Sequence, residues 1–196
     1  MDPKVNYPRI LSDRFREALD FAYRLHVNQK RKGTQIPYFA HLLGVTSLVL
    51  EDGGGEDEAI AAMLHDAVED QGGLDTLSTI EERFGKWVAF IVDSLTDAYE
   101  SPKPDWRLRK ERYISHLTNA PTEVRRVSLA DKLHNARSIL SSLQVEGEDI
   151  WLRFSGGKDG TLWYYDALVK VFSATGDDLM TKELSHVVSE IKKLVD

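Results

Sequence analysis

The fold of this chain is decided by residues 59–70, which have the sequence AIAAMLHDAVED. The small apolar residues at the start of this stretch predict a helix that is packed on most of its surface. Residues 65–70 then carry one imidazole and three carboxylates, and buried carboxylates are tolerated only when paired, hydrogen-bonded or bound to a metal. Because the stretch contains no Lys or Arg, we expect a cation to supply the compensating charge.

The sequence on both sides shows helical periodicity and no extended alternation of period two. Ser12 fits the N-cap of a first helix, Ser78 with Glu81 fits a capping box, and Pro121 fits the first position of a long helix. We therefore predict an all-α fold, a multi-helix bundle. The predicted helices cover about residues 12–29, 40–51, 59–70, 78–84, 86–97, 105–119, 121–143, 161–174 and 178–195, with a loop-rich segment at 144–160.

The composition fits one domain spanning residues 1–196, because 42% hydrophobic and 29% charged residues are ordinary for a globular chain of this length. The chain has no cysteine, which excludes disulfides, zinc ribbons and thiol catalysis. Any metal site must therefore use His, Asp, Glu or water as ligands.

Charge and hydropathy limit the location and the partners. The first twenty residues lack the apolar region of a signal peptide, and no stretch approaches the roughly 18 apolar residues of a membrane span, so we expect a cytoplasmic protein. A net charge of −7 argues against nucleic acid or anionic membranes as partners. The oligomeric state is left open.

Helical spacing predicts how the acidic end of the first stretch is arranged. Residues three and four apart share one side of a helix, so His65 should neighbour Glu69, and Asp66 should neighbour both Glu69 and Asp70. For His65 and Asp66 alone, a helix-terminal pair with the imidazole favoured by the helix dipole is an alternative interpretation. Solvated helix ends are the corresponding alternative for Glu69 and Asp70.

A second polar set lies within residues 127–135, VSLADKLHN, where Asn135 follows Asp131 by one helical turn. His41 begins a helix that could pack beside both sets. Together, His41, His65, Asp66 and Asp131 would form a four-ligand divalent site with open positions for water and substrate. Mn²⁺, Fe²⁺ or Zn²⁺ would suit these ligands, whereas His26 and His134 are expected on helix faces or in support of the ligands.

These residues resemble the H…HD…D signature of the HD-domain metal-dependent phosphohydrolases, which are helical. The longer motifs narrow the resemblance to the hydrolase domain of RelA/SpoT homologues, which remove the 3′-pyrophosphate from ppGpp and pppGpp. The resemblance covers about residues 14–140, with helices at 161–195 completing the domain. The motifs are QKRK at 29–32, PYFAH at 37–41, LHDAVED at 64–70, LADKLHN at 129–135 and, more loosely, GTLWYYDAL at 160–168.

The resemblance implies a stand-alone small alarmone hydrolase, since the chain ends where the long RelA/SpoT enzymes continue into further domains. It departs from the family at Leu42, where a proline is usual, and in a loop before Pro37 that is one residue longer. The expected activity is guanosine-3′,5′-bis(diphosphate) 3′-pyrophosphohydrolase, with Mn²⁺ as the expected metal. The alternatives are hydrolysis of ppApp, of a nucleoside monophosphate or of the 2′-phosphate of NADPH, or a non-catalytic alarmone sensor.

The resemblance also implies roles for individual residues. Glu69 and Asp70 match the ED pair that positions or activates the attacking water, Asn135 matches a nucleotide contact, and Arg31 matches a residue that packs on guanine. An acidic protein that binds a highly phosphorylated nucleotide needs a local basic patch. The candidates for this patch are Arg24, Lys30, Lys32, Lys132, Arg137 and Lys158, and Tyr165 is a candidate for the base pocket.

Overall fold

The computed structural model describes residues 11–97, 99, 104–176 and 179–195. Within these residues all regular structure is helical, apart from an isolated antiparallel bridge between Lys30 and Pro37, so the all-α prediction is confirmed. The predicted domain limits, residues 1 and 196, lie outside the described residues. No described helix combines the length and the apolar character needed to cross a bilayer.

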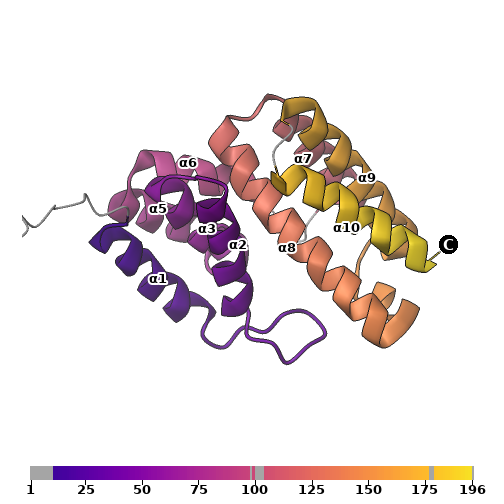
Figure 1. The fold of residues 1–196 in the computed structure, drawn as a ribbon. Helices are drawn as coiled ribbons and strands as arrows, with labels where there is room; N and C mark the ends of the chain where they lie inside the picture. The colour runs from indigo at the N-terminus through magenta and orange to yellow at the C-terminus, as the bar shows by residue number, and fades with distance from the viewer. Residues whose placement is uncertain (1–10, 98, 100–103, 177–178, 196) are drawn as a thin grey trace, which may run out of the picture.

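The N-terminal helices surround α3 on one side of the molecule (Figure 1). Ser12 caps α1 as predicted, since its hydroxyl accepts a hydrogen bond from the Arg14 N–H at 3.2 Å. Gly85, at a φ of 93°, makes the turn that separates α5 from α6. The helices are α1 (Asp13–His26), α2 (Phe39–Glu51), α3 (Glu56–Leu64), α4 (Ala67–Asp70), α5 (Gly73–Phe84) and α6 (Lys86–Leu95).

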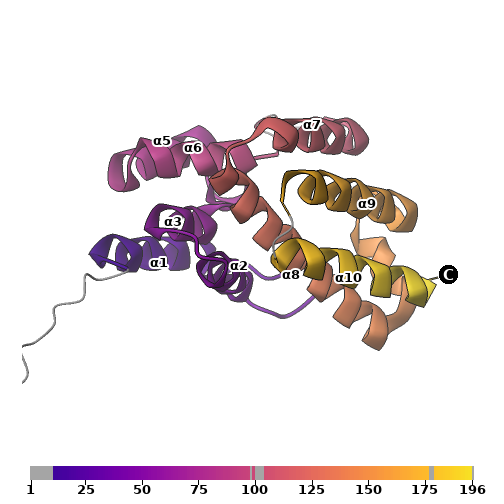
Figure 2. The ribbon, with the colours of Figure 1, turned by 45° about the horizontal axis from the view of Figure 1, so that its top comes forward.

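The C-terminal helices lie on the other side of the molecule, and α8 is the long helix that runs between the two groups, with α10 packed directly against it (Figures 1 and 2). They are α7 (Trp106–Asn119), α8 (Thr122–Glu146), α9 (Gly157–Thr175) and α10 (Leu179–Val195), with the 3₁₀ helix η1 (Gly147–Arg153) after α8. Part of the segment predicted as loop at 144–160 is thus helical. The loop between α1 and α2 extends from the N-terminal group toward the C-terminal half of α8 (Figure 1).

The centre of the core is α3, whose residues 59–64 are all fully buried. This helix contacts α1, α2, α6 and α8, and one cluster of buried apolar side chains joins both helical groups. The prediction that residues 59–64 are packed on most of their surface is confirmed. Because α3 ends in the interior, it delivers the residues that follow it to a buried position.

Further local predictions were wrong. Pro121, predicted at the first position of a helix, is the N-cap of α8. The stretch 59–70 is not one helix, because α3 ends at Leu64 and α4 begins at Ala67; Asp66 adopts φ −99° and ψ 0° between them, a conformation common at functional turns. The helix predicted to start at Ser78 begins at Gly73 instead, and the positive φ of Gly72 and Gly73 makes the turn into it.

Candidate active site

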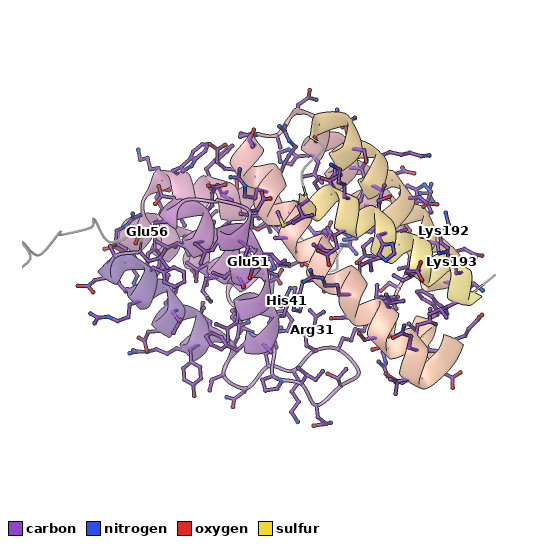
Figure 3. The ribbon with its side chains drawn as sticks, viewed as in Figure 1. Arg31, His41, Glu51, Glu56, Lys192 and Lys193 are labelled. Atoms are coloured by element: carbon purple, nitrogen blue, oxygen red, sulfur yellow. The ribbon has the colours of Figure 1, made fainter. Side chains whose placement is uncertain are left out.

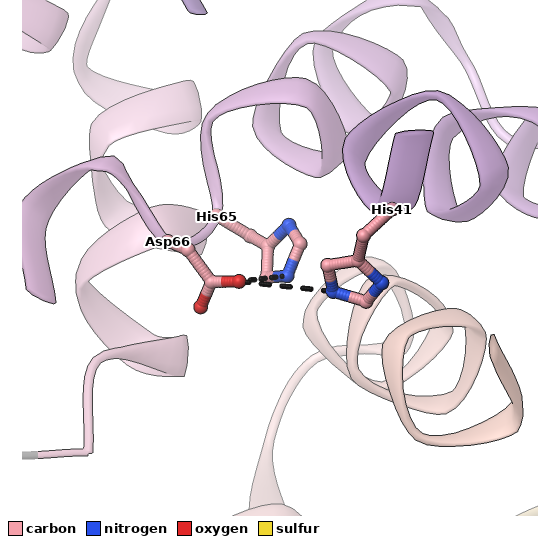
Figure 4. Close-up of side chains that lie close together, drawn as sticks. All are labelled: His41, His65 and Asp66. Atoms are coloured by element: carbon pink, nitrogen blue, oxygen red, sulfur yellow. Dashed lines mark ion pairs between the residues drawn. The ribbon is translucent and has the colours of Figure 1, made fainter. Parts of the chain in front are cut away.

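The side chains of His41, His65 and Asp66 converge between α2, the end of α3 and α8 (Figure 4). One potential ligand atom from each lies within 4.8 Å of the others. Asp66 Oδ2 is 2.8 Å from His65 Nε2 and 3.7 Å from His41 Nε2. Asp131 enters from α8, and its Oδ1 lies 3.2 Å from His41 Nε2 and 3.7 Å from His65 Nε2. All the predicted metal ligands therefore meet at one place.

The two imidazoles are prepared to donate lone pairs to a cation. Nε2 of His41 and of His65 is buried and makes no hydrogen bond of acceptable geometry to the described residues. Nδ1–H of His65 donates to the Ala62 carbonyl at 2.8 Å, which leaves Nε2 as the atom that faces Asp66 and Asp131 and that could bind a metal. Two imidazole nitrogens and two carboxylates fit a divalent transition metal with open positions.

His134 holds His41 in place through a contact between their Nδ1 atoms of 2.9 Å. Space for this ring depends on Gly44 of α2, because a Cβ there would lie 2.3 Å from His134 Cδ2. Burial, together with the neighbouring His41 and Arg31, lowers the pKa of His134 to about 4. A neutral imidazole can share one proton with His41, so His134 supports the ligand as expected.

The two metal-site carboxylates are held ionised by their surroundings. Burial alone would raise the pKa of Asp131, but Lys132 and the two imidazoles hold it well below its usual range. Lys132 Nζ and Asn135 Nδ2 each donate to Asp131 at 2.6 Å. The Tyr38 hydroxyl donates to Asp66 Oδ2 at 2.5 Å. Tyr38 belongs to the PYFAH motif, but sequence reasoning gave it no role.

Glu69 and Asp70 occupy different positions. Glu69 faces a small cavity together with Asp66 and Asp131, and its Oε2 accepts a hydrogen bond from the Asp97 N–H at 3.2 Å. Asp70 lies outside the lining of that cavity and accepts from Gln29 Nε2 at 2.7 Å. Burial and the nearby charge of Asp66 raise the pKa of Asp70.

Two cavities meet at Tyr38 and Asn135, which line both. The inner cavity, about 170 Å³, is lined by His65, Asp66 and Asp131 of the metal site together with Lys110 and Lys132. The outer cavity, about 600 Å³, lies between the α1–α2 loop, α8 and η1. This volume is in the usual range for a site that binds a small organic ligand.

Lys110 is an inner-cavity residue that sequence reasoning missed. It is largely buried, and its Nζ donates to Asp97 Oδ2 at 3.0 Å. Burial, together with the neighbouring positive charge of Lys132, lowers the pKa of Lys110 to about 7. Nothing in the local sequence distinguishes it from the other charged residues of α7, because only the packing of α7 over the cavity selects it.

Some of the predicted substrate-binding residues line the outer cavity and others do not. Arg31 donates to Asn135 Oδ1 at 2.6 Å and lies beside His41 between α2 and α8 (Figure 3); Lys32 and Arg137 also line this cavity. Arg24 instead pairs with Asp20 at 2.7 Å on the exposed face of α1. Four of the predicted residues line neither cavity, namely Arg24, Lys30, Lys158 and Tyr165.

The residues outside the cavities have other partners. Lys30 Nζ donates to Gln35 Oε1 at 2.5 Å. Lys158 donates to the Val195 carbonyl at 2.7 Å and lies 3.2 Å from a carboxylate oxygen of Glu148. Tyr165 is buried in the core. A basic or aromatic residue that lies close to a motif in the sequence therefore does not necessarily lie at the site.

Comparisons of the sequence and the fold identify known proteins that are similar to this chain. The model of the HD domain family matches residues 18–162. A relative from Xenopus tropicalis, guanosine-3′,5′-bis(diphosphate) 3′-pyrophosphohydrolase MESH1, is 39% identical over 126 residues, covering 63% of this chain and 68% of the relative. The protein of the same name from Homo sapiens is 36% identical over the same shares.

Solved structures agree with the sequence comparison. A structure described as a metazoan ortholog of SpoT that hydrolyzes ppGpp matches with a TM-score of 0.76 at 25% identity, covering 95% of this chain and 98% of that one. A structure from Listeria monocytogenes EGD-e matches with a TM-score of 0.68 at 29% identity, covering 78% of this chain and 99% of that one.

Proposed function

This chain belongs to the HD domain family, and from that premise we propose that it hydrolyses the 3′-pyrophosphate of guanosine alarmones, releasing GDP or GTP and pyrophosphate. The observation that carries the proposal is the convergence of two buried, unpartnered Nε2 atoms with two carboxylates beside a basic cavity. The relatives' names, which specify this reaction, support it.

A divalent metal follows from the family and from the donor set, and we propose Mn²⁺ held by His41, His65, Asp66 and Asp131. When bound, such an ion polarises a phosphoryl oxygen and lowers the pKa of water. Tyr38 and Asn135 orient the two carboxylate ligands through the hydrogen bonds described above.

The remaining cavity residues divide into two tasks. Glu69, held by the Asp97 backbone, orients the attacking water and accepts its proton, and Asp70 supports it from the next position of α4. Lys110 and Lys132 supply positive charge for the pyrophosphate group in the inner cavity. The nucleoside occupies the outer cavity, where Arg31, Lys32 and Arg137 are available to it.

We also propose that residues 1–196 act as one hydrolase domain in the cytoplasm, with a small nucleotide rather than nucleic acid or a membrane as partner. The single hydrophobic cluster of the described residues supports one domain. The net charge of −7 supports a small ligand that is received by a local basic cavity.

The test is chromatographic assay of the Mn²⁺-loaded protein against ppGpp, pppGpp, ppApp and NADPH in parallel. We expect turnover of ppGpp and pppGpp, with loss of turnover in EDTA and recovery when Mn²⁺ is added. Turnover of NADPH or ppApp without turnover of ppGpp would assign another substrate. Binding of ppGpp without turnover of any substrate would identify a sensor.

A further inference from the structure

The outer cavity continues well beyond the residues that hold the reacting end of the substrate. Along α8 its wall runs from Asn135 to Ser142, about two helical turns. Its far wall is η1, through Ile150, Arg153 and the adjoining Phe154. The cavity therefore has a catalytic end at Asn135 and a remote end at η1.

Arg153 is the cationic group of the remote end. Its guanidinium contacts Glu146, with Nη1 3.1 Å from Oε1, and Glu146 follows Asn135 by about three turns of α8. Its side chain crosses Gly33, where a Cβ would lie 2.6 Å from Arg153 Cδ and Nε. Gly33 has a φ of +73°, so this close approach is one that only glycine allows without strain. The side chain is 24% exposed.

Arg153 retains donors for a ligand. A guanidinium has five N–H groups, and the hydrogen bonds of Arg153 to Glu146 use Nη1 and Nη2. A planar guanidinium with free donors is the side chain best suited to bind a phosphate.

The orientation of the proposed substrate indicates which of its groups would reach the remote end of the outer cavity. If the 3′-pyrophosphate lies in the inner cavity, the ribose lies near Asn135 and the 5′ substituent points into the outer cavity. A cation at the remote end takes no part in cleavage of the 3′ group. Its charge is useful only for a nucleotide that is also phosphorylated on the 5′ side.

We propose that Arg153 binds the 5′-polyphosphate of the nucleotide and makes the enzyme select 5′-phosphorylated substrates. This inference rests on the proposed function, because it assumes that the 3′ group is the one cleaved. Arg153 is thus a specificity-determining residue. Its partner Glu146 keeps the side chain extended along the cavity wall when no nucleotide is bound.

The experiment compares two substrates that differ only on the 5′ side, pppGpp and guanosine 3′-diphosphate with a 5′-hydroxyl. Steady-state kinetics would be measured for the wild type, for Arg153→Gln, and for Arg16→Gln as a control with an exposed, ion-paired arginine on α1. We expect Arg153→Gln to raise KM for pppGpp by about 10-fold, the effect of losing one charge-assisted hydrogen bond, and to leave kcat within about twofold. KM for guanosine 3′-diphosphate should stay within about twofold.

Each other outcome contradicts a specific statement. An equal rise of KM for both substrates would mean that Arg153 only holds the Gly33 loop, and an unchanged KM for both would mean that it contacts no substrate; either result overturns this inference alone. The inference alone would also be overturned if the wild type hydrolysed guanosine 3′-diphosphate with the same KM as pppGpp. Failure of the wild type to hydrolyse either nucleotide would overturn the proposed function and the inference with it.

Discussion

The inner and outer cavities are adjacent, but they are built in different ways. The metal site beside the inner cavity takes its ligands from α2, the end of α3 and α8, and its two histidines are at most 3% exposed. The outer cavity shares α8 with the metal site, but its other walls are the α1–α2 loop and η1, whose Ile36 and Leu152 are among the exposed large apolar side chains. The chemistry thus rests on the core, whereas recognition of the nucleotide rests in part on the more exposed α1–α2 loop.

The largest effect should come from removing a metal ligand. We expect His65→Ala to abolish detectable ppGpp hydrolysis, because stabilisation by the ion is worth several kcal/mol and each 1.36 kcal/mol is tenfold in rate. Metal content by mass spectrometry should fall in parallel. His186→Ala, at an exposed position of α10, is the matched control, and full activity of His65→Ala without metal would refute the assignment.

The next largest effect is expected at Glu69, where the loss of kcat should exceed the loss at Asp70. Glu69→Gln should lower kcat by about 10²- to 10⁴-fold, the usual contribution of a general base, with metal content and KM unchanged. Asp70→Asn should lower kcat less, because Asp70 is bonded to Gln29 outside the inner cavity. Equal losses in kcat for the two variants would show that the separation of these side chains has no functional meaning.

An intermediate effect is expected at Gly44. A Cβ at this position would displace His134, and loss of a group that orients a metal ligand typically costs about 10- to 100-fold in metal affinity or activity. We expect Gly44→Ala to weaken Mn²⁺ binding, measured by titration calorimetry, by that factor. Ser47→Ala, on the exposed side of α2, should bind Mn²⁺ as the wild type does.

A smaller effect should appear in the pH profile. With a pKa of about 7, Lys110 loses its charge as the pH rises through 7, so kcat/KM for ppGpp should decline on the alkaline side by up to about 10-fold per pH unit. Lys110→Arg keeps its charge at all these pH values, so its decline should begin at higher pH. Identical profiles for the two proteins would exclude a role for the Lys110 charge.

The smallest effects are expected on KM, and they should distinguish basic residues that line the outer cavity from those that do not. Arg31→Ala removes a donor from the outer cavity and should raise KM for ppGpp by roughly 10-fold, the value of a hydrogen bond to a charged group. Arg24→Ala removes only an exposed ion pair with Asp20 and should leave KM within about twofold. A rise in KM for Arg24→Ala as large as that for Arg31→Ala would mean that the nucleotide extends beyond the cavity.

The sequence predicted the inner cavity better than the outer one for a physical reason. Metal ligands need fixed residue types at fixed spacing, so His41, the His65-Asp66 pair and Asp131 could be found together. The break between α3 and α4 could not be predicted, because helical periodicity in the sequence continues through residues 65 and 66. His134 was expected to support a ligand, but its contact with His41 depends on the space left by Gly44 of α2.

Residues outside these motifs were harder to place. Arg24 and Lys158 are cationic and close in sequence to relevant segments, yet each is engaged elsewhere. Arg153 and Lys110 lie in segments with no recognisable motif and reach the cavities only through tertiary packing. Charge alone does not tell which side of a helix faces a ligand.

One hydrogen-bonded series joins the two cavities. Arg31 donates to Asn135, and Asn135 donates to the ligand Asp131, at 2.6 Å in each case. A nucleotide that binds Arg31 or Asn135 must change the surroundings of Asp131, and any such coupling is reciprocal because it is a free energy shared by two binding equilibria. If the metal tightens nucleotide binding, the nucleotide must tighten metal binding by the same factor, so scarcity of either would weaken binding of the other.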